Sequence, residues 1–590
     1  MTRGEKIAWI WVWTAMTLVV IGSSFAVWRY GSLVFPYLDA FACNSTGAGR
    51  VAACQRAAAE QAPLAIRAAA LRQLVIVDGG KPETTVERLS LLIRLGVANA
   101  EDWNDRGNAH YALRKFDKAA DDFRTAGLMN TAVGTYWSNL ADAQLEAGRY
   151  GDAIYNYTTA MRKGENNAEV RGKRGWARFQ LGNYAGALAD YDKAVLQQPE
   201  HIDNLNERGL VHHARGDYRA ALADFDRSLK LTPDSVIILA NRSSSHARLG
   251  QWDEALADID RAISLDPKYF PARLDKAWLL IDRRQPEKAL SELATLTAPT
   301  GFELRLFEAR AQAHSHLNQW DSVITNADKA VALGSRASWL YQIRADARYE
   351  LGDPEGAIAD ATLALAGEPT NSKALVTRAF ALLLSDRPET AIADMELFVR
   401  TSPDRPYALE VRSYFHLTWG RLDAALSDAK LSAALAPTSP ASAVALGRML
   451  AETGDGAAAL AQCNRALDLA ETALAWRCRA LAYHLLGQHD LAAADIKRAL
   501  ALNNASANSQ ILMGRIELAQ GNLREAVERF NEALLMEPYV GPDVFMFRGD
   551  AVRALGNLGQ ARLDYREAKK RDLGRYGSQL AERLTSLPAQ

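Results

Sequence analysis

The sequence predicts an all-α solenoid of about fourteen helix–turn–helix repeats that follows one N-terminal transmembrane helix. Closely similar strings recur every 34 residues, as at 181–195, 215–229 and 249–263. A glycine recurs near the middle of ten of the fourteen periods, and a proline recurs near the end of seven of them. A two-helix unit cannot bury its apolar face alone, so a period of this length is typical of stacked repeats.

The repeats span residues 100–573 when Val236 is taken as position 1 of the fifth unit. Fourteen units then fit, and only two steps deviate, being 33 residues before Ala473 and 35 before Pro542. Position 8 is Gly, Ala or Ser in all fourteen units, and position 20 is Ala in thirteen. Small residues at fixed positions predict two helices whose axes approach closely.

The ends of both helices can be read from each unit. Ten units carry Gly at position 15, such as Gly182 and Gly216, where a helix end favours a left-handed residue. Seven units carry Pro at position 32, such as Pro199 and Pro233, and proline cannot continue a helix. Apolar residues between these positions follow helical spacing, which predicts a helix, a tight turn and a second helix.

The repeated residues resemble the tetratricopeptide repeat. In unit two the resemblance is carried by Trp137, Leu140, Ala141, Gly148, Tyr150, Ala153, Tyr157 and Ala160. The resemblance covers about 100–573 and implies a superhelical solenoid, but it specifies a fold far better than an activity.

Position 7 departs from the family pattern, because it is cationic in eleven units. Ten of these carry an acid sixteen residues later: Arg106 with Asp122, Arg174 with Asp190, Arg208 with Asp224, Arg242 with Asp258, Lys276 with Glu292, Arg344 with Asp360, Arg378 with Asp394, Arg412 with Asp428, Arg479 with Asp495, and Arg548 with Asp564. Arg310 faces Asn326 instead. The covariation predicts an ion pair between the two helices of a unit. The alternative is a row of arginines that binds a ligand, which we disfavour because the matched acids neutralise the cations.

The N-terminal segment 7–28 holds twenty-two residues without a charge, enough to span a bilayer. Tryptophans lie near both ends, and Arg3 and Lys6 precede the segment, so residues 1–6 are expected in the cytoplasm and the solenoid outside it. We expect an uncleaved signal anchor in an inner (cytoplasmic) membrane with a periplasmic solenoid. A signal peptide cleaved near 24–26 and a reversed anchor are the alternatives.

The four cysteines form two local pairs, Cys43 with Cys54 and Cys463 with Cys478. Two disulfides are plausible in an oxidising compartment. For Cys463, a small buried residue in place of the usual aromatic is the competing interpretation.

Two flanking segments are expected to close the ends of the solenoid. Residues 29–99 contain alanine-, leucine- and arginine-rich stretches with helical spacing, which predict two or three helices that form a linker and N-terminal cap. Residues 574–590, with Leu580, Leu584 and Leu587, predict a C-terminal capping helix.

The resemblance implies that the first helix of each unit lines a concave groove that binds a peptide or helix of a partner protein. The groove positions give Trp176, Phe179, Trp278, Trp339, Tyr349, Val376, Phe380, Leu383, Tyr407, Tyr414 and Leu417. Tight winding could bury about half of these residues between units.

Two other binding chemistries are disfavoured. Asn104, Asn108, Asn139 and Lys173 match part of the family's carboxylate clamp, but a lysine is missing from the first clamp unit and Glu169 occupies a position of the third. Five histidines share position 11, namely His110, His212, His246, His314 and His416, yet only two are in consecutive units. We expect packing histidines and no metal or cofactor site.

Composition supports an interaction protein rather than an enzyme. The formal net charge is −1, from 69 basic and 70 acidic residues, so nucleic acid is not an expected partner. No nucleophile motif or phosphate-binding loop is present, and the repeats leave no room for an ordinary catalytic domain. We expect a membrane-anchored scaffold for secretion, polysaccharide export or envelope assembly. The alternatives are a chaperone or quality-control adaptor for exported polypeptides and, less favoured, an enzyme built from the repeats.

Overall fold

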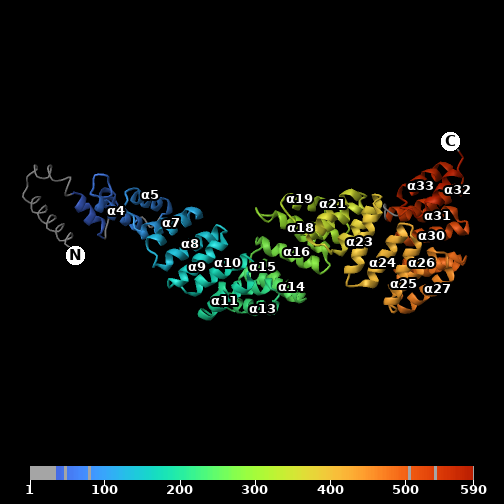
Figure 1. Ribbon diagram of the computed structural model, residues 1–590, viewed down its shortest axis with the longest axis horizontal. Helices are drawn as coiled ribbons and strands as arrows, with labels where there is room; N and C mark the ends of the chain where they lie inside the picture. Colours follow the sequence, from blue (N-terminus) through green and yellow to red (C-terminus); the bar gives the residue numbers. More distant parts are fainter. Residues whose placement is uncertain (1–34, 46–48, 78–80, 503–505, 537–540, 589–590) are drawn as a thin grey trace, which may run out of the picture. The chain divides into compact units, whose positions relative to one another are not determined.

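The computed structural model describes residues 35–45, 49–77, 81–502, 506–536 and 541–588, and these residues form helices and connections without a β-strand. The chain divides into two compact units, residues 1–275 and 276–590. Within each unit the helices follow one another in antiparallel pairs, in the order of the sequence (Figure 1). The predicted all-α repeat fold is confirmed.

The first helix of each repeat begins at or within one residue of the predicted start. These helices are α6 (Ala100–Ala112), α8 (Gly134–Glu146), α10 (Ala168–Gln180), α12 (Ile202–Ala214), α14 (Val236–Arg248), α16 (Phe270–Asp282), α18 (Glu303–His316), α20 (Ser338–Glu350), α22 (Ser372–Leu384), α24 (Arg405–Thr418), α26 (Pro440–Glu452), α28 (Ala473–Leu485), α30 (Ala507–Gln520) and α32 (Pro542–Ala554).

The second helix of each repeat packs against the first helix of the same repeat. The second helices are α7 (Phe116–Met129), α9 (Tyr150–Arg162), α11 (Tyr184–Gln197), α13 (Tyr218–Leu231), α15 (Trp252–Leu265), α17 (Pro286–Ala294), α19 (Trp320–Ala332), α21 (Pro354–Gly367), α23 (Pro388–Thr401), α25 (Leu422–Leu435), α27 (Gly456–Leu469), α29 (His489–Leu502), α31 (Leu523–Met536) and α33 (Leu558–Arg571).

The turn inside each repeat depends on a left-handed residue at position 15. All ten predicted glycines have positive φ, between 72° at Gly182 and 87° at Gly454 and Gly556. The other four repeats reach the same conformation with a side chain, at Arg114, Arg284, Asn318 and Asp386, with φ between 54° and 58°. The turn is therefore imposed by the helix pair even where the residue is unfavourable.

In five repeats a glycine at position 8 accommodates an aromatic ring from position 24 of the second helix. A Cβ atom added at Gly209 would lie 2.6 Å from the Phe225 ring, and one at Gly549 would lie 2.5 Å from the Tyr565 ring. Phe225 and Tyr565 are fully buried. Their burial explains why the sequence keeps position 8 small, because a larger residue would push the helices apart.

The segments that flank the repeats are also helical. The first includes α3 (Arg50–Ala57), α4 (Leu64–Val77) and α5 (Pro82–Arg94), and α5 packs on α6 at the start of the repeats. The second is α34 (Gly577–Thr585), which buries Leu580 completely and packs on α33. Both lie where the sequence predicts capping elements.

The predicted transmembrane segment, 7–28, lies outside the described residues. None of the helices in the described part of the chain is both long and apolar enough to cross a membrane.

Candidate functional site

All ten predicted pairs of a cation at position 7 and an acid at position 23 are in contact in the structure. In the nine Arg–Asp pairs the guanidinium donates two hydrogen bonds to the carboxylate, from Nε and from one terminal nitrogen. In the tenth pair, Lys276 Nζ lies 2.9 Å from Glu292 Oε1. The nine aspartates are between 1% and 7% exposed. These pairs join the two helices of one repeat inside the core.

Most of the same arginines also contact the preceding repeat, a contact that was not predicted. Arg344 Nη1 donates to Asp328 at 2.6 Å, and Arg174 Nη1 donates to Thr158 at 2.9 Å. Other partners at the same position 25 are Asp192, Asp226, Thr362, Asn464 and Asn531. The signal in the sequence is a short polar residue fifteen to seventeen positions before these arginines. Each arginine with such a partner therefore connects three helices.

Position 11 supplies a further neighbour for the buried aspartates. His110 Nε2 lies 3.8 Å from Asp122, and His416 Nε2 lies 3.9 Å from Asp428. Burial lowers the pKa of both histidines, so these side chains are neutral at physiological pH. Two repeats carry arginine at the same position, and Arg178 lies 2.7 Å from Asp190. The position-11 histidines belong to the packing of the repeats.

Metal-ligating side chains do not gather in the described residues, where no group of three or more His, Cys, Asp or Glu could hold an ion. The five histidines at position 11 lie on different repeats, and His246 and His314 contact glutamines on their own turns, Gln251 and Gln319.

The groove positions of residues 276–590 form a line of aromatic rings along successive first helices. The ring centres of Tyr349 and Phe380 are 6.5 Å apart, and those of Phe380 and Tyr414 are 6.0 Å apart. The Arg448 guanidinium lies 4.9 Å from the Tyr414 ring. Tyr414 is 46% exposed, so the line is accessible at this point.

The remaining predicted groove residues differ in exposure. Tyr407 is 55% exposed, whereas Trp176, Phe179, Trp278, Trp339 and Val376 are half-buried. Trp278 and Trp339 contact each other, as do Trp176 and Phe179. Leu383 and Leu417 are a correction, because they are 5% and 0% exposed and lie in the core. Position 12 of these repeats faces the second helix and the neighbouring repeat, so neither leucine offers a binding surface.

The partial carboxylate clamp at the first three repeats is internally satisfied. Lys173 Nζ lies 2.9 Å from Asp142 and 2.9 Å from Glu169. Asn139 donates a hydrogen bond to Asn104 at 2.8 Å. The lysine that would bind a carboxylate of a ligand already contacts two carboxylates of the chain.

A cavity lies at the groove positions of α26, α28 and α30. Four arginines line it: Arg448, Arg477, Arg515 and Arg575. Cys478 lines it as well and forms a disulfide with Cys463, while Cys43 and Cys54 form the second disulfide.

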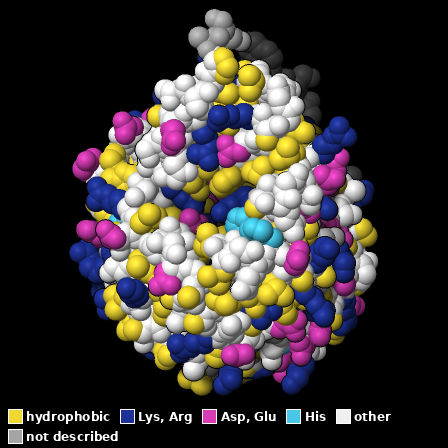
Figure 2. Space-filling model, turned by 90° about the vertical axis from the view of Figure 1, so that its right-hand side faces the viewer, with side chains coloured by type: hydrophobic (Ala, Val, Ile, Leu, Met, Phe, Trp, Pro, Cys, Tyr) yellow, Lys and Arg dark blue, Asp and Glu magenta, His cyan; other side chains and the backbone are white. Residues whose placement is uncertain are grey.

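The face in Figure 2 shows acidic and basic side chains interspersed, with neither sign forming a continuous patch.

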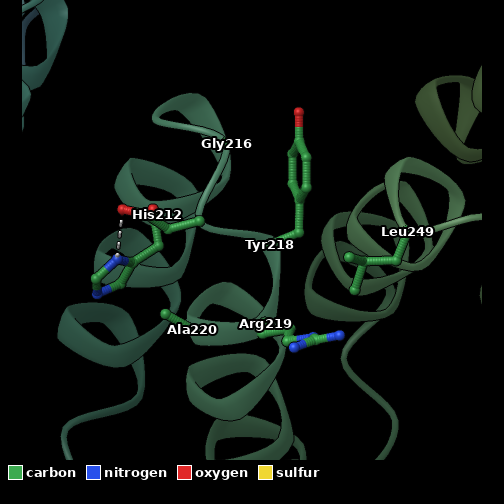
Figure 3. Close-up of a pocket in the computed structure, with 7 residues that line it drawn as sticks. His212, Gly216, Tyr218, Arg219, Ala220 and Leu249 are labelled. Carbon is green, nitrogen blue, oxygen red and sulfur yellow. Dashed lines mark ion pairs between the residues drawn. The ribbon is translucent and has the colours of Figure 1, made fainter.

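A second hollow lies at the turn between α12 and α13. Figure 3 shows the His212 ring on one side of this turn, beside Asp217, and the Tyr218 ring standing on the other side. The hollow is open, and its residues come from the end of α12, the turn, the start of α13, and Leu249 after α14. None of them is at a groove position.

The paired helices, the left-handed turn and the small position 8 define the chain as an all-α helix–turn–helix repeat protein. Tetratricopeptide-repeat models match residues 104–168, 138–204, 173–236, 206–270 and 511–575, and a second model of the same repeat matches 246–313. Residues 104–313 and 511–575 are therefore tetratricopeptide repeats, which implies a scaffold for protein–protein interaction.

Solved structures with similar repeats have low sequence identity to the chain. A tetratricopeptide-repeat protein from Parabacteroides merdae ATCC 43184 is 21% identical over 42% of this chain and 97% of its own, with a TM-score of 0.38. The APC/C hetero-tetramer Cut9–Hcn1 is 15% identical over 77% and 91%, with a TM-score of 0.42. YrrB, a repeat protein with an unusual peptide-binding site, is 18% identical over 32% and 96%, with a TM-score of 0.28. A search of curated proteins found no match.

Proposed function

We propose that this protein is a non-enzymatic, membrane-anchored scaffold that captures a partner polypeptide in the groove of its second compact unit. The observation that carries the proposal is the line of rings at Tyr349, Phe380 and Tyr414, with centres 6.0–6.5 Å apart on successive first helices. Aromatic side chains supply large contact areas at little cost in conformational entropy, which suits the binding of an extended or helical segment.

The compartment is part of the proposal. The uncharged segment 7–28 would anchor the protein in the inner membrane, with the repeats in the periplasm. Two disulfides in the structure are consistent with an oxidising compartment, because disulfides are rare in the cytosol. Secretion, polysaccharide export and envelope assembly remain the processes that we associate with such a scaffold.

Crosslinking capture from living cells tests the proposal. The full chain should recover a discrete, stoichiometric partner, and Tyr407→Asp with Tyr414→Asp should reduce that recovery about tenfold or more. Both tyrosines are exposed, so the helices should stay folded. Tyr155→Asp on α9, where Tyr155 is 69% exposed, is the matched control and should have no effect.

Two outcomes would change the proposed partner or the proposed binding surface. A broad set of unrelated exported polypeptides would favour the chaperone or quality-control adaptor instead. Unchanged capture by the groove variants would exclude this groove as the binding surface. A fusion reporter placed after residue 590 checks the compartment independently. A reporter signal from the cytoplasm would show that the anchor has the reversed orientation.

A further inference from the structure

The cavity at α26, α28 and α30 is lined by more positive than negative charge. Its four arginines, Arg448, Arg477, Arg515 and Arg575, face two acids, Glu452 and Asp543. Four cations and two anions leave a formal excess of two positive charges, in a protein whose net charge is −1.

The groove arginines differ from the position-7 arginines in their partners. Each of the nine paired position-7 arginines is held by a buried aspartate, as Arg479 is by Asp495 at 2.6 Å. Arg448 instead lies over the Tyr414 ring, and Arg515 lies 4.6 Å from the Phe547 ring, with no ion pair to either arginine among the described residues. Aromatic stacking positions a guanidinium but leaves its charge and its N–H donors available.

Arg515 carries the most specific signal. Its Nε atom is enclosed and has no hydrogen-bond partner among the described residues. A guanidinium has only donors, and an enclosed donor without an acceptor is unfavourable. The described residues therefore leave this guanidinium without a carboxylate, and a carboxylate that enters the cavity could pair with it.

The segment after the last repeat completes the cavity. Residues 572–576 connect α33 to α34 and bring Arg575 to Glu452, with Nη2 and Oε2 2.5 Å apart. The segment passes so close to Gly420 that a Cβ atom there would lie 2.7 Å from the Gly574 carbonyl oxygen. This contact fixes the fourth guanidinium beside the other three, and Glu452 shows that a carboxylate fits there.

The residues between the arginines are apolar. They are Val444, Leu474, Leu481, Ile511 and Leu512, contributed by three successive first helices. A polyphosphate would gain nothing from these side chains, whereas a polypeptide that carries carboxylates beside apolar residues would match both features of the lining.

From the two guanidinium groups without an ion pair, those of Arg448 and Arg515, and from the apolar lining, we infer that this cavity binds an acidic–apolar segment of the partner, with its carboxylates on Arg448 and Arg515. The inference rests on the proposed function, because it assigns the chemistry of the partner that the groove captures. It gives the C-terminal half of the groove a specificity for acidic segments that the aromatic line does not provide.

Fluorescence anisotropy with two labelled peptides tests the inference on the full-length protein in detergent. One peptide alternates glutamate with leucine, and the other has glutamine in place of glutamate. We expect the glutamate peptide to bind about tenfold or more tightly at low salt, with a preference that decreases as sodium chloride is added.

Variants test which residues cause the preference for the glutamate peptide. Arg448→Gln with Arg515→Gln should reduce binding of the glutamate peptide to that of the glutamine peptide, whose affinity should not change and so reports a folded groove. The same positions changed to Lys should keep most of the preference, because the charge remains. Arg498→Gln, at an exposed arginine on α29, is the matched control and should have no effect.

The outcomes separate this inference from the proposed function. Equal affinity for the two peptides, or a preference that survives the double Gln variant, overturns the inference but leaves a peptide-binding groove. Binding of neither peptide counts against both. Displacement of the glutamate peptide by inorganic pyrophosphate at equal concentration would reveal a small-anion site and also overturn the assignment to a polypeptide.

Discussion

Arg344 and Asp360 face each other across the two helices of the eighth repeat, and two hydrogen bonds of 2.8 and 2.5 Å join them. The two residues are 7% and 1% exposed. A pair enclosed to this degree is strongly destabilised when one partner is removed, because the other charge is left buried.

Removal of either member should lower the free energy of unfolding by about 3 kcal/mol, measured by chemical denaturation of Arg344→Ala and Asp360→Ala. The double variant should lose much less than the sum of the two. The exposed pair of Arg124 and Asp121 is the control, and its coupling should be about 0–1 kcal/mol. An absence of coupling between Arg344 and Asp360 would contradict this interpretation of the repeats.

Addition of a methyl group at position 8 should destabilise a repeat. Gly209→Ala places a Cβ atom 2.6 Å from the buried Phe225 ring, and we expect a loss of about 1–3 kcal/mol in denaturant unfolding. Gly151→Ala, in a helix where a Cβ atom would meet nothing within 4 Å, should be neutral or stabilising. Equal effects at the two glycines would show that helix propensity, and not close packing, sets the residue at position 8.

Relief of a strained turn should stabilise the protein. Asp386 occupies position 15 with a φ of 56°, a conformation that glycine adopts freely. Asp386→Gly should therefore raise the free energy of unfolding by about 1 kcal/mol, while Asp386→Ala should not. A loss of stability in the glycine variant would mean that the aspartate side chain contributes more than its backbone costs.

Glu207 should make stability depend on pH. Burial raises its pKa to about 7, and it accepts a hydrogen bond from the Tyr191 hydroxyl at 2.8 Å. The ordinary pKa is 4.5, so between these values the folded protein binds more protons than the unfolded chain. Its contribution to stability is therefore complete below pH 4.5 and is lost as the pH rises towards 7.

The variant Glu207→Gln should remove this dependence. Its free energy of unfolding relative to the parent should rise with pH by on the order of 2 kcal/mol, as measured by denaturation at several pH values. A difference that stays constant across the range would show that Glu207 titrates normally.

Much of the fold could be predicted because each repeat encodes its own ends. Position 15 and the proline at position 32 fixed the helix boundaries, so most first helices begin at the predicted residue. The ion pairs could be predicted as well, because positions 7 and 23 vary together among the repeats. The repeats of one chain can thus be compared with one another as aligned homologues would be. The contacts from the position-7 arginines back to position 25 escaped prediction because their partners vary among Ser, Thr, Asn and Asp.

The groove was harder to predict than the fold. The pattern placed Leu417 beside Tyr414, yet one is fully buried and the other is 46% exposed. Their positions differ by less than one helical turn, and only the packing of α24 on its neighbours separates them. The arginine cavity was missed altogether, because its four arginines come from four separate parts of the chain and one of them, Arg575, lies outside the repeats.

By itself, the sequence determined the repeat, its helix ends and the paired charges, because these depend on spacings that one helix pair satisfies locally. Only the tertiary structure decided which side chains remain exposed and which arginines lack a carboxylate. Stacking brings residues from distant repeats together, and no local spacing records that the segment at Arg575 returns to Glu452.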